Sequence, residues 1–137
     1  QASYNQRSMT VVRNGILAAS VLFMAACSDA PLQLANIQIG RALNPDRSIA
    51  SITTLFKPSE TIYVSVQTTG AAPGTIGVKW MYQGRVVDEP VKQVDYDGPD
   101  STEFHIQNSG RFPEGDYSVE IFINGAQVGT RAFKVGG

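Results

Sequence analysis

Few side chains in this chain of 137 residues are of the kinds that act as nucleophiles, bases or zinc ligands. It contains one cysteine, Cys27, and one histidine, His105. His105 stands between Phe104 and Ile106, so in a strand its side chain points away from the face that these two share. Nucleophilic catalysis requires a base and an orienting acid beside the nucleophile, and zinc requires several His or Cys ligands. We therefore expect no enzymatic activity, no cofactor and no such metal centre.

An acidic stretch near residue 97 is the second group of side chains with ligating chemistry. Asp95, Asp97 and Asp100 surround Gly98 and Pro99. Calcium prefers hard oxygen ligands from turns of this kind. The spacing does not fit the helix-loop-helix calcium pattern, because the glycine comes too early and a proline follows it. The sequence favours an acidic surface turn, with a calcium or ligand loop at these three aspartates as the alternative.

Cys27 stands at the end of a short apolar segment. Residues 9–27 read MTVVRNGILAASVLFMAAC, in which Arg13 forms a basic head and an uncharged run follows. This layout is typical of a secretory signal, and the run is shorter than the roughly 20 apolar residues that a membrane-spanning helix needs. Its last four residues, Met24-Ala25-Ala26-Cys27, resemble a bacterial lipobox, in which the cysteine is acylated and becomes the first residue of the mature protein.

The lipobox resemblance implies a membrane partner, reached through a lipid anchor on Cys27. Ser28 follows the cysteine, and lipoproteins with serine there usually travel to the outer membrane. We therefore expect a lipid-anchored protein of the bacterial cell envelope, in the outer membrane and facing the periplasm or the cell surface. A plain secretory signal that leaves Cys27 free is the alternative.

The chain divides into three parts on this interpretation. Residues 1–26 are upstream residues plus the signal peptide, residues 27–33 are the lipidated cysteine and a short tether, and residues 34–137 form one folded domain. Removal of Arg7 and Arg13 with the signal leaves nine of the 11 basic residues against 12 acidic ones, a net charge of −3. Because no basic stripe remains to neutralise phosphates, we expect no nucleic-acid partner.

The sequence of the folded part predicts a succession of short β-strands. Apolar and polar residues alternate with a period of two, and β-branched and aromatic residues are frequent, as in half-buried strands. Pro90 interrupts one such stretch and indicates an edge strand or a broken pair. The predicted strands cover residues 35–43, 60–69, 75–83, 86–94, 101–107, 116–124 and 127–135.

Turn residues separate these runs. Asn124-Gly125 lies between two strands and is a strong hairpin signal. Val128 is out of phase with Phe133 and Val135, which predicts a bulge near Gly129.

Two aromatic residues indicate how the strands are arranged. Trp80 lies in the middle of a strand, and Tyr117 opens a later strand after Pro113. The pattern resembles the immunoglobulin-like sandwich, which buries a tryptophan and uses such a tyrosine to bond back to the backbone. The resemblance implies an all-β fold, a single antiparallel immunoglobulin-like β-sandwich of about seven strands. Where true immunoglobulin domains have a cysteine, this chain has Val119, with Val64 or Val66 as its expected partner across the core.

Met81 and Phe122 are out of phase with the core residues of their strands. In an immunoglobulin-like fold their strands are neighbours, so the two side chains are expected together on the outer face of one sheet. Exposed apolar clusters mark interfaces. The alternative is that a loop, residues 45–57, covers them.

We expect a non-enzymatic interaction or adaptor module of a cell-envelope assembly, which binds a protein partner through a sheet face or edge. Two alternatives stay open. One is a module that binds glycan or another ligand through loop aromatics, Tyr96 and Phe112, and the acidic loop. The other is a structural subunit that polymerises by exchange of a strand such as residues 33–43.

Overall fold

The computed structural model describes residues 30–137, and Cys27 with the rest of the expected signal region lies outside them. The described residues form β-strands and contain no helix, so no helix among them is long and apolar enough to cross a membrane. The strands are β1 (Gln33–Gly40), β2 (Leu55–Phe56), β3 (Ile62–Thr69), β4 (Pro73–Tyr82), β5 (Arg85–Asp88), β6 (Val91–Asp95), β7 (Asp100–Ile106), β8 (Gly115–Ile123) and β9 (Ala126–Val135).

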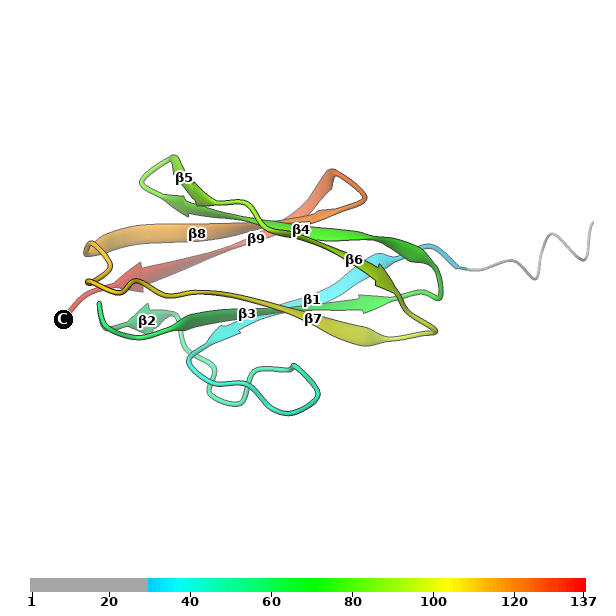
Figure 1. The fold of residues 1–137 in the computed structure, drawn as a ribbon, viewed down its shortest axis with the longest axis horizontal. Coiled ribbons are helices and arrows are strands. Elements are labelled where there is room, and N and C mark those ends of the chain that lie inside the picture. The colour runs from blue at the N-terminus through cyan, green and yellow to red at the C-terminus, as the bar shows by residue number, and fades with distance from the viewer. Residues whose placement is uncertain (1–29) are drawn as a thin grey trace, which may run out of the picture.

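Two sheets face each other in a sandwich (Figure 1). The smaller sheet has the order β1-β3-β7, and the larger has the order β2-β9-β8-β4-β5, with β6 also paired to β4. All pairs are antiparallel except β2 with β9. The predicted all-β sandwich is confirmed, but the described part has nine strands where about seven were expected. Pro90 divides the predicted strand at residues 86–94 into β5 and β6, and the two-residue β2 was not predicted.

The core fills the space between the two sheets. Trp80 is fully buried on β4, and its ring meets Phe133 of β9 edge-on at 6.1 Å between ring centroids. Val64, Val66 and Val119 are buried in the same apolar cluster, so branched aliphatic side chains fill the place where immunoglobulin domains have a disulfide. Burial of this apolar surface is the main force that holds the sheets together.

The predicted tyrosine corner is present. The Tyr117 hydroxyl donates a hydrogen bond to the Pro113 carbonyl oxygen at 2.7 Å. Burial, reinforced by the neighbouring Tyr82 phenol, raises the pKa of Tyr117 to about 12. Its hydroxyl therefore stays protonated and able to donate across the whole physiological pH range.

The hairpin between β8 and β9 has the predicted turn and the predicted bulge. Asn124 and Gly125 both have positive φ, 51° and 85°, as a tight two-residue hairpin turn requires. Ile121 lies opposite Gly129, whereas Phe122 lies opposite Gln127, which leaves Val128 as the extra residue. Because of this extra residue, the side chains of Phe133 and Val135 point into the core.

The described chain begins already attached to the sandwich. The Ala30 carbonyl oxygen accepts a hydrogen bond from the Ala71 amide at 3.0 Å, and Leu32 is buried. β1 then pairs with β3 of the same chain from Gln33 onwards. Residues 30–33, which we expected to belong to the tether, therefore belong to the folded unit.

Candidate functional site

The long segment between β1 and β2 covers the smaller sheet. Arg47 forms an ion pair with Asp100 and donates from Nε to the Ser101 carbonyl at 2.7 Å, both on β7. The Ile49 amide donates to Gln38 of β1, and the Ile49 side chain is buried. The alternative that residues 45–57 cover Met81 and Phe122 is therefore wrong, because residues 45–53 lie on the opposite sheet and β2 joins the larger sheet at its edge, beside β9 and away from β4.

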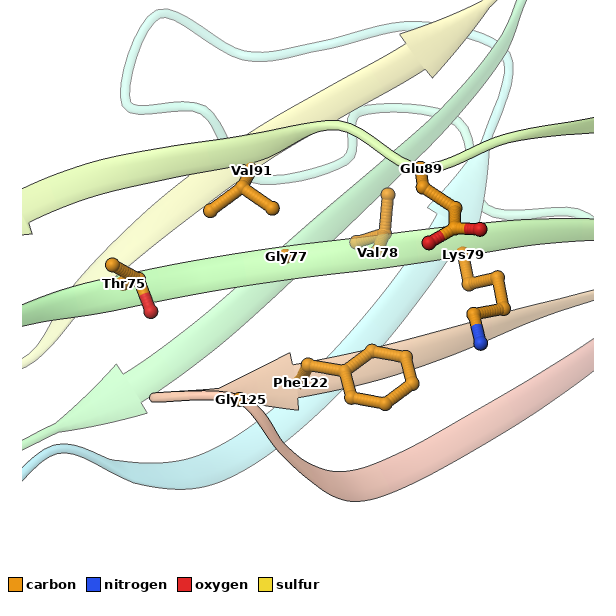
Figure 2. A pocket seen from close by; sticks show the side chains of 8 residues that line it. All are labelled: Thr75, Gly77, Val78, Lys79, Glu89, Val91, Phe122 and Gly125. Atoms are coloured by element: carbon orange, nitrogen blue, oxygen red, sulfur yellow. The ribbon is translucent and has the colours of Figure 1, made fainter.

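The outer face of the larger sheet carries an apolar hollow. Gly77 of β4 pairs with Val91 of β6 on one side and with Phe122 of β8 on the other. Because glycine has no side chain, the row Val91–Gly77–Phe122 has a gap in its middle (Figure 2). The cavity has a volume of ≈ 200 Å³ and is completed by Thr75, Lys79, Glu89 and Gly125. We refer to it as the Gly77 hollow.

Gly77 is needed for this shape. A Cβ atom there would lie 3.1 Å from Cγ2 of Val91 and 3.4 Å from the Pro90 carbonyl oxygen. The first contact is tighter than ordinary packing, so the Val91 side chain would have to shift by a few tenths of an ångström, and the added carbon would also fill the floor of the hollow. The Val91 side chain is 65% exposed, so the hollow has an apolar wall that the described chain leaves in solvent.

Charged groups of both signs border the hollow. The Lys79 ammonium lies 5.3 Å from the centroid of the Phe122 ring, in the arrangement of a cation–π contact. Glu89 lines the hollow, and Glu120 lies opposite Lys79 in the ladder. An apolar floor with a charged rim can hold one aliphatic side chain of a partner and select the charges that flank it.

The predicted pair is only partly brought together. Phe122 lies opposite Gly77, whereas Met81 lies opposite Ser118, four residues further along β4. Both side chains are half-buried on the same outer face, with Lys79 between them. Phe122 therefore forms a wall of the hollow, and Met81 belongs to a separate row beside Val86.

The residues that complete the hollow, Gly77 and Val91, were missed by sequence reasoning. A glycine inside a strand signals a close approach by another group, and that signal is present at Gly77. Val91 gives no such signal, because its place beside Gly77 depends on how the chain turns at Pro90.

The three aspartates of the acidic loop do not converge. Asp95 ends β6, Asp97 lies in the loop, and Asp100 begins β7. The Asp100 carboxylate is bound by Arg47 and by the Ser101 amide. Within residues 30–137, no three His, Cys, Asp or Glu side chains are placed to hold a metal ion together.

The loop aromatics and the histidine occupy structural positions. Phe112 is buried against Tyr117, so its expected display for stacking on sugars is wrong. The Tyr96 hydroxyl lies 2.8 Å from the Thr102 hydroxyl, and its ring packs on the core. His105 is exposed, as expected, and pairs with Glu103 beside the Tyr63 ring.

A second cavity of ≈ 480 Å³ opens between the sheets near the C-terminal end of β4. Tyr82 and Tyr117 line it, with ring centroids 4.6 Å apart, together with Asp88 and Asn108. Both tyrosine hydroxyls are already donated to backbone carbonyls, Tyr82 to Glu114 and Tyr117 to Pro113. This cavity offers aromatic surface more than free hydrogen-bonding groups.

Comparison with known proteins identifies the fold alone. No protein-family profile matches the sequence, and no curated protein matches it. Among solved structures, an immunoglobulin-like protein from Pseudomonas aeruginosa is similar, with a TM-score of 0.54 at 14% identity over 78% of this chain and 98% of that one. A β-glucosidase from Listeria innocua is also similar, with a TM-score of 0.52 at 11% identity. That match covers 79% of this chain but only 16% of the enzyme. At these identities the likeness concerns architecture alone, and on that ground the chain has an immunoglobulin-like β-sandwich fold.

Proposed function

We propose that this protein is a lipid-anchored, non-enzymatic interaction module of the bacterial cell envelope. Its partner is a protein that inserts an aliphatic side chain into the Gly77 hollow. The observation that carries the proposal is the uncovered row Val91–Gly77–Phe122, which remains open because residues 41–53 lie on the other sheet. The lipid anchor is proposed from the sequence around Cys27.

Binding of one side chain in the hollow contributes a modest free energy, which is nevertheless enough to change a partner's affinity severalfold. Burial of one aliphatic side chain contributes about 1.5–3 kcal/mol, and each 1.4 kcal/mol changes a dissociation constant about tenfold. A single side chain in the hollow therefore decides whether a partner binds usefully, while the surrounding sheet face supplies complementarity.

A charge placed on the wall of the hollow tests the site. Val91→Glu is compared with Leu55→Glu, on the same sheet, because the two side chains are 65% and 63% exposed. A partner is first identified by crosslinking of the membrane-bound protein and is then purified. We expect Val91→Glu to weaken its affinity at least tenfold and Leu55→Glu to leave the affinity unchanged. Equal affinities for both variants would exclude the hollow as the binding site.

The anchor has its own test. Mass spectrometry of the membrane-extracted protein should find a lipid mass on Cys27, and Cys27→Ala should move the protein to the soluble fraction. Separation of inner and outer membranes then tests the location that Ser28 indicates. An unmodified Cys27 would make this a secreted domain without a lipid anchor.

Ligand binding is the second candidate, and the ≈ 480 Å³ cavity beside Tyr82 favours it, since its volume suits a small molecule. Titration with purified envelope polysaccharide, compared with the Tyr82→Ala variant, distinguishes this function from protein binding. Saturable binding that Tyr82→Ala removes and Val91→Glu leaves intact would support the ligand-binding alternative.

A further inference from the structure

We infer that one end of the sandwich is held closest to the lipid bilayer, so that the opposite end stands farther from it. This inference rests on the proposed lipid anchor at Cys27. The end in question is formed by residues 30–31, 70–72, 97–99 and 124–125, which we call the anchor end. The occupant of this surface is the headgroup layer of the membrane.

The attachment of the first described residues carries the argument. The Ala30 carbonyl oxygen accepts a hydrogen bond from the Ala71 amide, and the Pro31 carbonyl oxygen packs so closely on Gly70 that a Cβ atom there would clash with it. Leu32 is buried beside Gly74. These contacts fix the start of the folded chain to the loop between β3 and β4 and leave only Ser28 and Asp29 between the anchor and the sandwich.

The tether therefore limits the distance from the bilayer. From Cys27 to Ala30 the chain advances three residues, and fully extended it reaches at most about 11 Å. β4 has ten residues, so the sandwich is about 33 Å long in the strand direction. The tether is much shorter than the domain, so the domain cannot turn its other end to the membrane without contacts along its side.

The other loops at the anchor end follow from the strand register. Pro73 at the start of β4 pairs with Asp95 at the end of β6, and Thr68 pairs with Asp100. Asn124 in the turn between β8 and β9 bonds to Thr75. Figure 1 shows the loops between β3 and β4 and between β6 and β7 at the end of the molecule opposite to the C-terminus.

Charge does not draw this end to the membrane. The four segments of the anchor end contain Asp97 and no lysine or arginine. An aspartate is repelled by anionic headgroups. The orientation is therefore set by the short tether and not by electrostatic attraction.

Energy transfer from a single fluorophore to acceptor-labelled headgroups tests the orientation. In the acylated full-length protein the Cys27 thiol carries the lipid, so an introduced cysteine is the free thiol. Asp97→Cys places the label at the anchor end, and Gln107→Cys places it just after β7, at the opposite end. Both positions are exposed. We expect severalfold stronger transfer from residue 97 than from residue 107, and equal transfer would overturn the orientation.

Two controls separate this inference from the anchor itself. Insertion of ten Gly and Ser residues between Asp29 and Ala30 should remove most of the difference between the labels, and an unchanged difference would show that the tether is not its cause. Cys27→Ala protein mixed with anionic vesicles should not bind, and binding would contradict a tether-set orientation. If no lipid mass is found on Cys27, the anchor proposal fails and this inference fails with it. If the lipid is present and the labels report equal heights, the orientation alone fails.

Discussion

Gly77 makes room for the hollow because it has no side chain. Gly77 lies between Thr75 and Lys79 on the outer face of β4. A larger residue at this position would fill the gap between Val91 and Phe122. The hollow is thus built from a row of three residues on three strands, of which only Phe122 was expected at an interface. The chemical character of the face follows from one missing Cβ atom.

At the residue scale, Tyr117→Phe tests the tyrosine corner. Loss of the hydrogen bond to Pro113 should lower the free energy of unfolding by about 1 kcal/mol at neutral pH. Denaturant titrations of both proteins give this difference. The Tyr63→Phe variant is a control, because Tyr63 lies beside His105 on the outer face of the smaller sheet.

The same pair of proteins should differ in pH dependence. The pKa of Tyr117 is raised from 10.0 to about 12 in the folded state, so the unfolded chain loses this proton first. The contribution to stability is complete below about pH 10 and is lost as the pH rises towards about 12. The stability of the unmodified protein should therefore fall more steeply than that of Tyr117→Phe over this interval, and parallel curves would contradict the raised pKa.

Residue positions were predictable where the signal was local. Trp80 and Tyr117 were placed correctly because strand phase and a turn a few residues away determine their surroundings. The row Val91–Gly77–Phe122 was not predictable, because it depends on the register between β4, β6 and β8. The burial of Phe112 was missed because a loop context gives no periodicity from which to infer an inward direction.

At the element scale, the segment at residues 41–54 decides which sheet face is free. Its attachment to β7 depends on Arg47, which adopts a positive φ of 72° and binds Asp100 and Ser101. The sequence did not show which face this stretch covers. That choice follows from side-chain contacts between residues far apart in the chain.

Arg47→Ala should loosen this segment without unfolding the protein. The ion pair is partly exposed, so the loss of global stability should stay within about 1 kcal/mol. Amide hydrogen exchange within residues 41–54 should accelerate severalfold, with Arg111→Ala as the exposed control. Unchanged exchange in Arg47→Ala would show that the buried Ile49 side chain holds the segment by itself.

The edge at β5 and β6 shows how far sequence reasoning reached for an element. Pro90 correctly predicted an interrupted edge, since proline has no amide hydrogen for the ladder. The two fragments nevertheless both pair with β4, and the Pro90 carbonyl oxygen accepts from the Val78 amide at 3.1 Å. The proline therefore divides a strand and keeps both halves on the same sheet.

At the scale of the whole molecule, the fold should be independent of its anchor. The described contacts that stabilise the sandwich begin at Ala30, three residues after the proposed anchor at Cys27. Cys27→Ala should therefore have the same thermal midpoint as the lipidated protein in detergent, while it no longer sediments with membranes. A large drop in the midpoint would mean that the lipid or its attachment contributes to folding.

Strand exchange receives no support from the arrangement of β1. The segment proposed for donation pairs along its length with β3 of its own chain, and Ile37 and Ile39 fill the core. Release of β1 would expose both side chains, so a polymer formed in this way would first require partial unfolding.

The antiparallel pairing of β1 with β3 also determines how the molecule bears mechanical load. A pull between Ala30 and a partner held near the far end of the sheets acts along the strands, whereas the hydrogen bonds of the ladder run across them. The bonds between β1 and β3 then share the tension and must break together, in shear, and do not open one after another like a zipper. If Cys27 carries the proposed lipid anchor, a domain attached in this way resists extension away from the membrane.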